Sequence, residues 1–198
     1  KQHIPSPAEV MTQIIQRVER TQIETVYSDI RLLTEDIASC YKFLLTKLYD
    51  AGCRYVQFDG VHSVIMEDTI RLNNRVLRER PAGMYVAFHA PTDMLVQLHG
   101  ADAYFLNYDC GACDRNRLLW FIHEKEAVFG FVLSHYPQED ELDELQAKTE
   151  SVLNYIPLKR FTLCLPDANA LLSPSEADEE KQWETVRLGM EMAARIFS

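Results

Sequence analysis

Short apolar runs alternate with longer amphipathic segments along this chain. In residues 29–51, apolar side chains such as Leu33, Ile37, Tyr41 and Leu45 recur near the 3.6-residue period, which predicts a long helix. Gly52 follows this segment and is expected to end the helix. Further helices are predicted over residues 67–80, which end before Pro81, and over residues 93–98, 139–154 and 178–197.

The apolar runs between these helices predict strands. They cover residues 53–59, 84–89, 103–109, 127–133 and 161–166. The N-terminal segment HIPSP, residues 3–7, is a candidate sixth strand that Pro5 and Pro7 would end. Strands that are apolar almost throughout and alternate with helices are typical of a parallel sheet covered on both faces. The chain is therefore expected to have an α/β fold.

Polar side chains stand at or just past the ends of four of these predicted strands. They are Asp59, His89, Asn107 and Asp167. In parallel α/β folds, ligands bind at the edge of the sheet where the carboxyl ends of the strands lie. Polar residues also end strands simply because loops begin there. Four such residues in succession nevertheless predict that Asp59, His89, Asn107 and Asp167 converge on one pocket.

Net charge and cysteine content indicate which partners and which cellular compartment to expect. The chain has 198 residues, a net charge of −10 and a pI near 5.0, which argues against nucleic acid and anionic membranes as partners. Five cysteines without framework-like spacing favour a reduced, cytoplasmic protein. No apolar run is long enough to span a membrane and no signal peptide is visible in the sequence.

Several segments resemble one family. They are IPSP at residues 4–7, YDAGCRYVQFD at residues 49–59, the strand ending in His89, YFLNYD at residues 104–109, YIPLKRFTLCLP at residues 155–166 and EEKQWETVRLGMEMAARIF at residues 179–197. In this order they resemble the C-terminal barrel of cobalamin-independent methionine synthase and its short single-barrel relatives. GCRYVQFD is among the most specific pieces, and the resemblance covers nearly the whole chain.

The resemblance implies a (β/α)8 barrel, a TIM-type fold, with a zinc ion at the strand ends. Residues 1–198 would form one domain with about six of the eight βα units, lacking the first two strands. In the family, zinc holds the thiolate of homocysteine, which attacks the methyl group of a methyltetrahydrofolate. A zinc-bound thiol loses its proton near neutral pH and becomes a nucleophile.

The resemblance also implies roles for individual residues. His89 matches a zinc ligand, and Asp59 matches the aspartate that holds the amino group of the substrate. Asn107 stands where a glutamate ligand is expected, and Asp167 stands where a cysteine ligand is expected; both become candidate substrate-binding residues. His135 follows a predicted strand and is a candidate catalytic residue, together with Asp59.

The sequence departs from the family pattern at several of these points. Gly60 replaces the acidic residue that usually follows Asp59, and Ala90 and Pro91 follow His89 where a cysteine motif is expected. The loops after Asp59 and His89 are shorter than in the family. Because stable zinc sites use three or four protein ligands, the chain is expected to bind zinc weakly or not at all.

Cys110-Gly-Ala-Cys113 follows the strand that ends near Asn107. These thiols are interpreted first as incidental loop residues, because no second Cys-x-x-Cys exists to complete a structural zinc site. A rearranged metal site that uses Cys110 and Cys113 with His89 is a second interpretation. A redox pair is the third, and it would require a lowered thiolate pKa.

Three functions follow from these observations. The leading hypothesis is methyl transfer from a methyltetrahydrofolate to a homocysteine-type thiol with altered zinc ligands, which makes homocysteine and folate the expected small-molecule partners. The alternative is a redirected relative that binds a small molecule without zinc. The third is a thiol redox protein that uses Cys110 and Cys113. No P-loop or glycine-rich dinucleotide motif supports another class of enzyme.

Overall fold

The structure, a computed structural model, describes residues 1–133, 139–164, 183, 187–188, 190–191 and 193–195. By its internal contacts the chain divides into two compact units, Lys1–Phe105 and Leu106–Ser198. Among the described residues, no helix combines the length and the apolar composition that crossing a membrane requires.

Six strands form a parallel sheet in the described part of the chain. They are β1 (Gln2–Pro5), β2 (Tyr55–Asp59), β3 (Tyr85–His89), β4 (Ala103–Asn107), β5 (Val128–Val132) and β6 (Phe161–Cys164). Their order in the sheet is β1-β2-β3-β4-β5-β6, the same as their order in the chain, and the pairs β1–β2, β2–β3, β3–β4 and β5–β6 are parallel. The predicted α/β fold with a parallel sheet is confirmed. The candidate strand at residues 3–7 corresponds to β1, although β1 ends at Pro5 and Pro7 begins the following helix.

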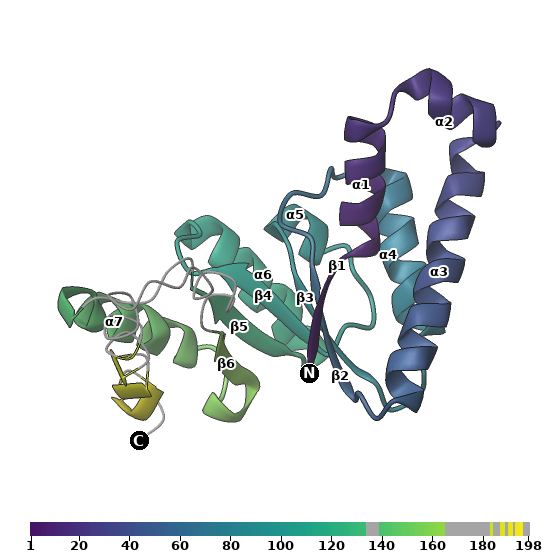
Figure 1. Cartoon of the computed structure of the whole chain (residues 1–198). Helices are drawn as coiled ribbons and strands as arrows, with labels where there is room; N and C mark the ends of the chain where they lie inside the picture. The colour runs from purple at the N-terminus through teal and green to yellow at the C-terminus, as the bar shows by residue number, and fades with distance from the viewer. Residues whose placement is uncertain (134–138, 165–182, 184–186, 189, 192, 196–198) are drawn as a thin grey trace. The chain divides into compact units, whose positions relative to one another are not determined.

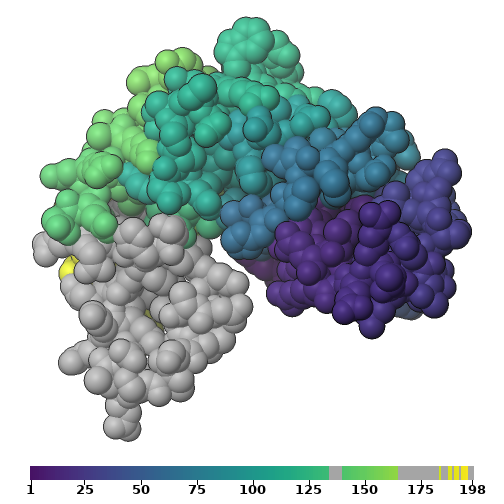
Figure 2. All heavy atoms as spheres, turned by 90° about the horizontal axis from the view of Figure 1, so that it is seen from above, coloured from purple at the N-terminus to yellow at the C-terminus, as the bar shows by residue number. Residues whose placement is uncertain are grey.

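The first unit contains five helices. They are α1 (Pro7–Arg17), α2 (Arg20–Val26), α3 (Ile30–Asp50), α4 (Glu67–Glu79) and α5 (Thr92–Leu95). The predictions for residues 29–51, 67–80 and 93–98 correspond to α3, α4 and α5. Helices α1 and α2 were not predicted, although Ser6 caps α1 by accepting a hydrogen bond from the Glu9 amide and Pro7 occupies its first turn. Helix α2 has no buried residue, and its atoms lie on the surface of this unit (purple in Figure 2).

Alternation along β2 separates a helix-covered face from a polar face. Val56 and Phe58 are fully buried, and the Phe58 ring contacts Tyr41 of α3 with centroids 5.8 Å apart. Helices α1, α3 and α4 pack against one another and lie beside the strands of this unit (Figure 1). Because successive side chains of a strand point to opposite faces, Gln57 and Asp59 lie on the face opposite Phe58.

The second unit contains α6 (Ala112–Lys125), the 3₁₀ turn η1 (Glu139–Glu141), α7 (Leu142–Leu153) and the 3₁₀ turn η2 (Leu158–Arg160). The helix predicted over residues 139–154 is confirmed as η1 and α7. Helix α6 was not predicted, because Trp120 is 75% exposed and interrupts the apolar stripe that buries Leu118 and Ile122.

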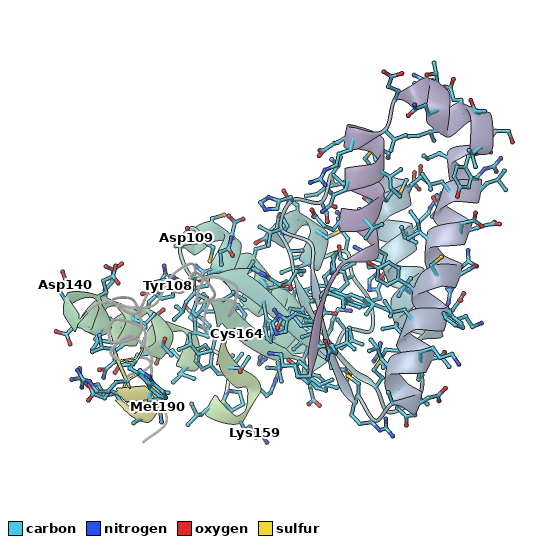
Figure 3. All side chains as sticks on the ribbon, viewed as in Figure 1. Tyr108, Asp109, Asp140, Lys159, Cys164 and Met190 are labelled. Atoms are coloured by element: carbon cyan, nitrogen blue, oxygen red, sulfur yellow. The ribbon has the colours of Figure 1, made fainter. Side chains whose placement is uncertain are left out.

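A small core holds this unit together. It consists of Leu133, Leu142, Leu145 and Leu188, with Tyr108 and Leu163 packed against it. Tyr108 directly follows β4 and is labelled in Figure 3. The closing helix predicted over residues 178–197 lies largely outside the described residues, and the positions described within it are helical.

Candidate functional site

Three polar side chains, one each from β1, β2 and β3, lie around the carboxylate of Asp59, the last residue of β2. His89 places Nδ1 3.3 Å from Asp59 Oδ1, and His3 places Nδ1 3.5 Å from Asp59 Oδ2. Gln57 donates a hydrogen bond from Nε2 to Asp59 Oδ1 at 3.1 Å. Each oxygen of one carboxylate therefore faces an imidazole nitrogen, and one oxygen also accepts from an amide.

The register of the parallel strands creates this arrangement. His3 of β1 pairs with Gln57 of β2, and Asp59 of β2 pairs with His89 of β3. Paired residues of parallel strands have side chains on the same face of the sheet. His3, Gln57, Asp59 and His89 therefore share the face that lies opposite Phe58. Gln57 also pairs with Ala87 of β3.

The charge state of Asp59 follows from its surroundings. Partial burial would by itself raise the pKa of the Asp59 carboxyl, because burial disfavours the ionised form. The hydrogen bonds from His89 and Gln57, together with the charges of His89 and His3, outweigh burial and hold this pKa below its usual value. Asp59 is therefore a carboxylate at neutral pH, and 38% of its side chain is exposed to solvent.

Backbone hydrogen bonds fix the ends of these strands. The Ser6 amide donates to the Asp59 carbonyl at 2.7 Å, and the Gly60 amide donates to the His89 carbonyl at 2.8 Å. At Gly60 the chain packs so closely that an added Cβ would lie 2.6 Å from Ser6 Oγ and 2.9 Å from Ser63 Oγ. The acidic residue that the resemblance leads one to expect here could not be placed without moving these neighbours.

The short segment between β2 and α4 is tied to α1. Ser63 donates from Oγ to Glu9 Oε2 at 3.2 Å, and the carboxylate of Glu9 is buried. The Val64 amide donates to Thr12 Oγ1 at 2.9 Å. Because Glu9 and Thr12 lie on the same buried face of α1, these contacts hold the segment after Asp59 in one place. These hydrogen bonds therefore restrain the end of β2, which carries the Asp59 carboxylate.

The cluster belongs to the first unit, and the other site residues predicted from the sequence do not. Asn107 is the last residue of β4 and belongs to the second unit. Asp167 and His135 lie outside the described residues. The structure thus brings together Asp59 and His89, whereas the convergence of all four strand-end residues stays a prediction.

None of the five cysteines, Cys110 and Cys113 included, forms a disulfide in the described part of the chain. Cys110 is half-buried just before α6, and burial raises the pKa of its thiol, although the nearby charges of Lys148 and Arg115 act in the opposite direction. Cys113 lies exposed in the first turn of α6. A raised pKa leaves Cys110 protonated at neutral pH, which is the opposite of what a redox nucleophile requires.

The described residues do not fit a zinc ion. No group of three or more His, Cys, Asp or Glu side chains among them is placed to hold a metal. His89, the matched ligand, directs Nδ1 at the Asp59 carboxylate. A tight zinc site needs three or four protein ligands, and Asn107 would offer only a neutral, weak oxygen.

Two residues of the cluster, His3 and Gln57, were missed in the sequence. Gln57 lies inside an otherwise apolar run two residues before Asp59, so period-2 alternation places both on one face. His3 could be found only if the N-terminal segment were aligned in register with β2. Gln57 is 2% exposed, and no described residue donates a hydrogen bond to its Oε1. A buried acceptor without a partner costs about 1–3 kcal/mol.

No protein-family model matches this sequence. Two uncharacterised proteins of Bacillus subtilis (strain 168) are similar to it. YxjH is 24% identical over 214 residues, which cover 87% of this chain and 56% of YxjH. YxjG is 23% identical over 212 residues, which cover 86% of this chain and 56% of YxjG. The chain therefore spans about half the length of the curated relatives it matches.

The match to YxjH extends over more positions than the 198 residues of this chain. YxjH therefore has residues within the matched region that have no counterpart here. Internal segments of this chain are thus shorter than those of the relative to which it is similar.

Proposed function

We propose that the chain folds as about six βα units of a (β/α)8 barrel. The strand order supports this proposal, because it follows the chain order from β1 to β6 without reversal. A doubly wound sheet, the main alternative, reverses its strand order at a switch point. Sequential parallel strands joined by right-handed crossovers place their helices on one face, as a barrel requires.

We further propose that the protein binds a small amino acid of the homocysteine type through the ammonium group of that ligand. The contact between Asp59 and His89, with Nδ1 and Oδ1 3.3 Å apart, carries this proposal. The resemblance to the methionine synthase family assigns the substrate amine to Asp59 and the thiol side to His89. Homocysteine separates its amine from its sulfur by only three carbons, so a ligand of this size fits two adjacent side chains.

The electrostatics of the cluster support the same ligand class. Asp59 keeps its negative charge because its pKa is lowered, and part of the carboxylate is exposed. An ammonium group is a suitable partner for an ionised carboxylate that lies in a half-buried site. The two imidazoles and the Gln57 amide hold the carboxylate, so that little ordering remains when the ligand binds.

Methyl transfer from a methyltetrahydrofolate to the bound thiol is the second candidate. The place of His89 beside the amine-binding Asp59 favours it, because the acceptor sulfur would then lie near His89. The reaction needs the thiol proton removed, and the described residues do not assemble the zinc site that removes it in the family. Binding of the amino-acid thiol is therefore the primary proposal, in the manner of a redirected relative. A thiol redox function has less support, because the pKa of Cys110 is raised.

Calorimetric titration with L-homocysteine tests the proposal. Wild type should bind, Asp59→Asn should bind at least about tenfold more weakly, and Asp50→Asn should bind like wild type, since Asp50 is exposed at the end of α3. Equal affinity of wild type and Asp59→Asn would contradict the proposal. A parallel assay with a methyltetrahydrofolate polyglutamate and added zinc measures methionine formation. Methionine formation at catalytic rates would make methyl transfer the primary function.

A further inference from the structure

The side-chain amide of Gln57 is oriented by its neighbour. Its Nε2 lies 3.1 Å from Oδ1 of Asp59. Asp59 is ionised, because its pKa is held below the usual value, so the amide must present its N–H group to the carboxylate. The opposite orientation would place a carbonyl oxygen against a negative charge. The position of Oε1 is therefore a consequence of the charge on Asp59.

With the amide in this orientation, Gln57 Oε1 is left without a donor. The side chain is 2% exposed, and none of the described residues donates a hydrogen bond to this oxygen. Buried side-chain acceptors in native proteins nearly always have a partner, and an exception calls for an explanation such as a water or a ligand. Gln57 lies on the polar face of β2, the same face that carries the Asp59 carboxylate.

We propose that Gln57 is a second ligand-contacting residue, whose Oε1 accepts a hydrogen bond from the ammonium group that Asp59 binds. This inference rests on the proposed binding of an amino acid at Asp59. An ammonium group carries three N–H donors, so it can donate to a carboxylate oxygen and to a neighbouring amide oxygen together. One amide would then both hold Asp59 in place through Nε2 and contact the ligand through Oε1.

This arrangement gives the site a preference that a carboxylate alone would not provide. A ligand that lacks the amine leaves the buried Gln57 Oε1 without a donor and offers the Asp59 carboxylate no cation. Sites built to hydrogen-bond a polar group reject analogues without that group strongly, because their own buried groups stay unpaired. Discrimination between an amine and its desamino analogue is therefore the property to measure.

The test uses the full chain with 13C-labelled glutamine. The Gln57 side-chain carbonyl signal is assigned by its loss in Gln57→Met, and it is followed during titration with L-homocysteine, with 4-mercaptobutanoate and with propylammonium chloride. 4-Mercaptobutanoate is homocysteine without its amine, and propylammonium carries the amine alone. We expect the Gln57 carbonyl signal to move with the two amines and to stay in place with 4-mercaptobutanoate.

Affinities provide the second measurement. Gln57→Met should weaken L-homocysteine binding about tenfold and leave 4-mercaptobutanoate binding unchanged. The matched control is Gln16→Met, because Gln16 is exposed on α1. It should bind both probes like wild type. Thermal unfolding of each variant shows whether the fold is kept. The carbonyl signal is titrated in the wild type, so Gln57→Met serves there only to assign it.

Each outcome separates this inference from the proposed function. If L-homocysteine binds while the Gln57 carbonyl signal stays unchanged, Asp59 acts without Gln57 and the inference is wrong, although the proposed function stands. If propylammonium moves the signal but L-homocysteine does not bind, Gln57 contacts amines and the proposed amino-acid ligand is wrong. If no probe moves the signal and Gln57 shows exchange contacts with water, a buried water satisfies Oε1 and the inference is overturned.

Discussion

His89 Nδ1 lies 3.3 Å from Asp59 Oδ1, although thirty residues separate the two in the chain. Asp59 ends β2 and His89 ends β3, and the parallel register of these strands aligns the two residues directly. His3 approaches the other oxygen of the same carboxylate. The charge on Asp59 therefore bears on the stability of the first unit and on the proposed binding of an ammonium group.

The first prediction concerns the pH dependence of stability. The pKa of Asp59 is lowered in the folded protein, so its carboxylate stabilises the fold above the ordinary aspartate pKa of about 3.9. This contribution is lost as the pH falls through the lowered folded pKa. Because 38% of the side chain is exposed, we expect Asp59→Asn to be less stable than wild type by under about 1 kcal/mol near neutral pH.

Urea unfolding between about pH 5 and about pH 3 measures this effect, and the difference in unfolding free energy between wild type and Asp59→Asn should shrink over that range. Asp50→Asn is the control, because Asp50 is exposed. A difference that is independent of pH would show that Asp59 does not stabilise the fold through its charge.

The second prediction concerns the packing at Gly60. In Gly60→Ala, the new Cβ would lie 2.6 Å from Ser6 Oγ and 2.9 Å from Ser63 Oγ, so these side chains or the backbone beside them must move. We expect a loss of about 2 kcal/mol in the free energy of unfolding, which is typical of overpacking. Gly111→Ala is the matched control, since the nearest atom to its added Cβ, Asp114 Oδ2, is 3.9 Å away. Chemical denaturation that gives the two variants equal stability would contradict the packing at Gly60.

The third prediction concerns the cysteine pair. Alkylation by iodoacetamide at about pH 7.5 should modify the exposed Cys113 faster than Cys110, because burial both shields Cys110 and raises the pKa of its thiol. Mass spectrometry of digested samples follows each site, and Cys110→Ser and Cys113→Ser confirm the assignments. Faster reaction of Cys110 would indicate an activated thiolate and would favour the redox function.

The fourth prediction concerns zinc. After dialysis against a mild chelator, we expect metal analysis to find well under one zinc ion per chain, because the described residues hold no three-ligand group. Replacing both Cys110 and Cys113 with serine should change neither the zinc content nor the binding of L-homocysteine. Stoichiometric zinc in wild type that is lost in the double variant would show that a metal site has been rebuilt around these thiols.

Local patterns predicted much of the secondary structure. The apolar period in residues 29–51 predicted α3, and the apolar runs predicted five of the six strands within a few residues. Helix α6 was not predicted, because the exposed Trp120 stands among apolar neighbours and the apolar positions therefore do not keep to one helix face. Helices α1 and α2 were not predicted either; α2 buries no side chain, so no apolar face marks it in the sequence.

The candidate site was only partly visible before the fold was known. Asp59 and His89 stood out as polar residues at the ends of apolar runs. Gln57 was hidden within such a run, and His3 lay in a segment with little pattern of its own. Their roles depend on a hydrogen bond from Gln57 to Asp59 and on the approach of the His3 imidazole to the same carboxylate, which the strand register creates.

The sequence by itself determined the alternation of strands and helices, the parallel α/β class and the identity of the polar residues at the strand ends. These properties follow from periodicity within short segments, where each residue's neighbours in space are also its neighbours in the chain. Only the tertiary structure decided that His3, Gln57 and His89 meet at Asp59 and that Gln57 Oε1 lacks a donor among the described residues. The physical reason is strand register, because it joins residues that lie far apart in the chain, and burial then removes the water that would otherwise satisfy them.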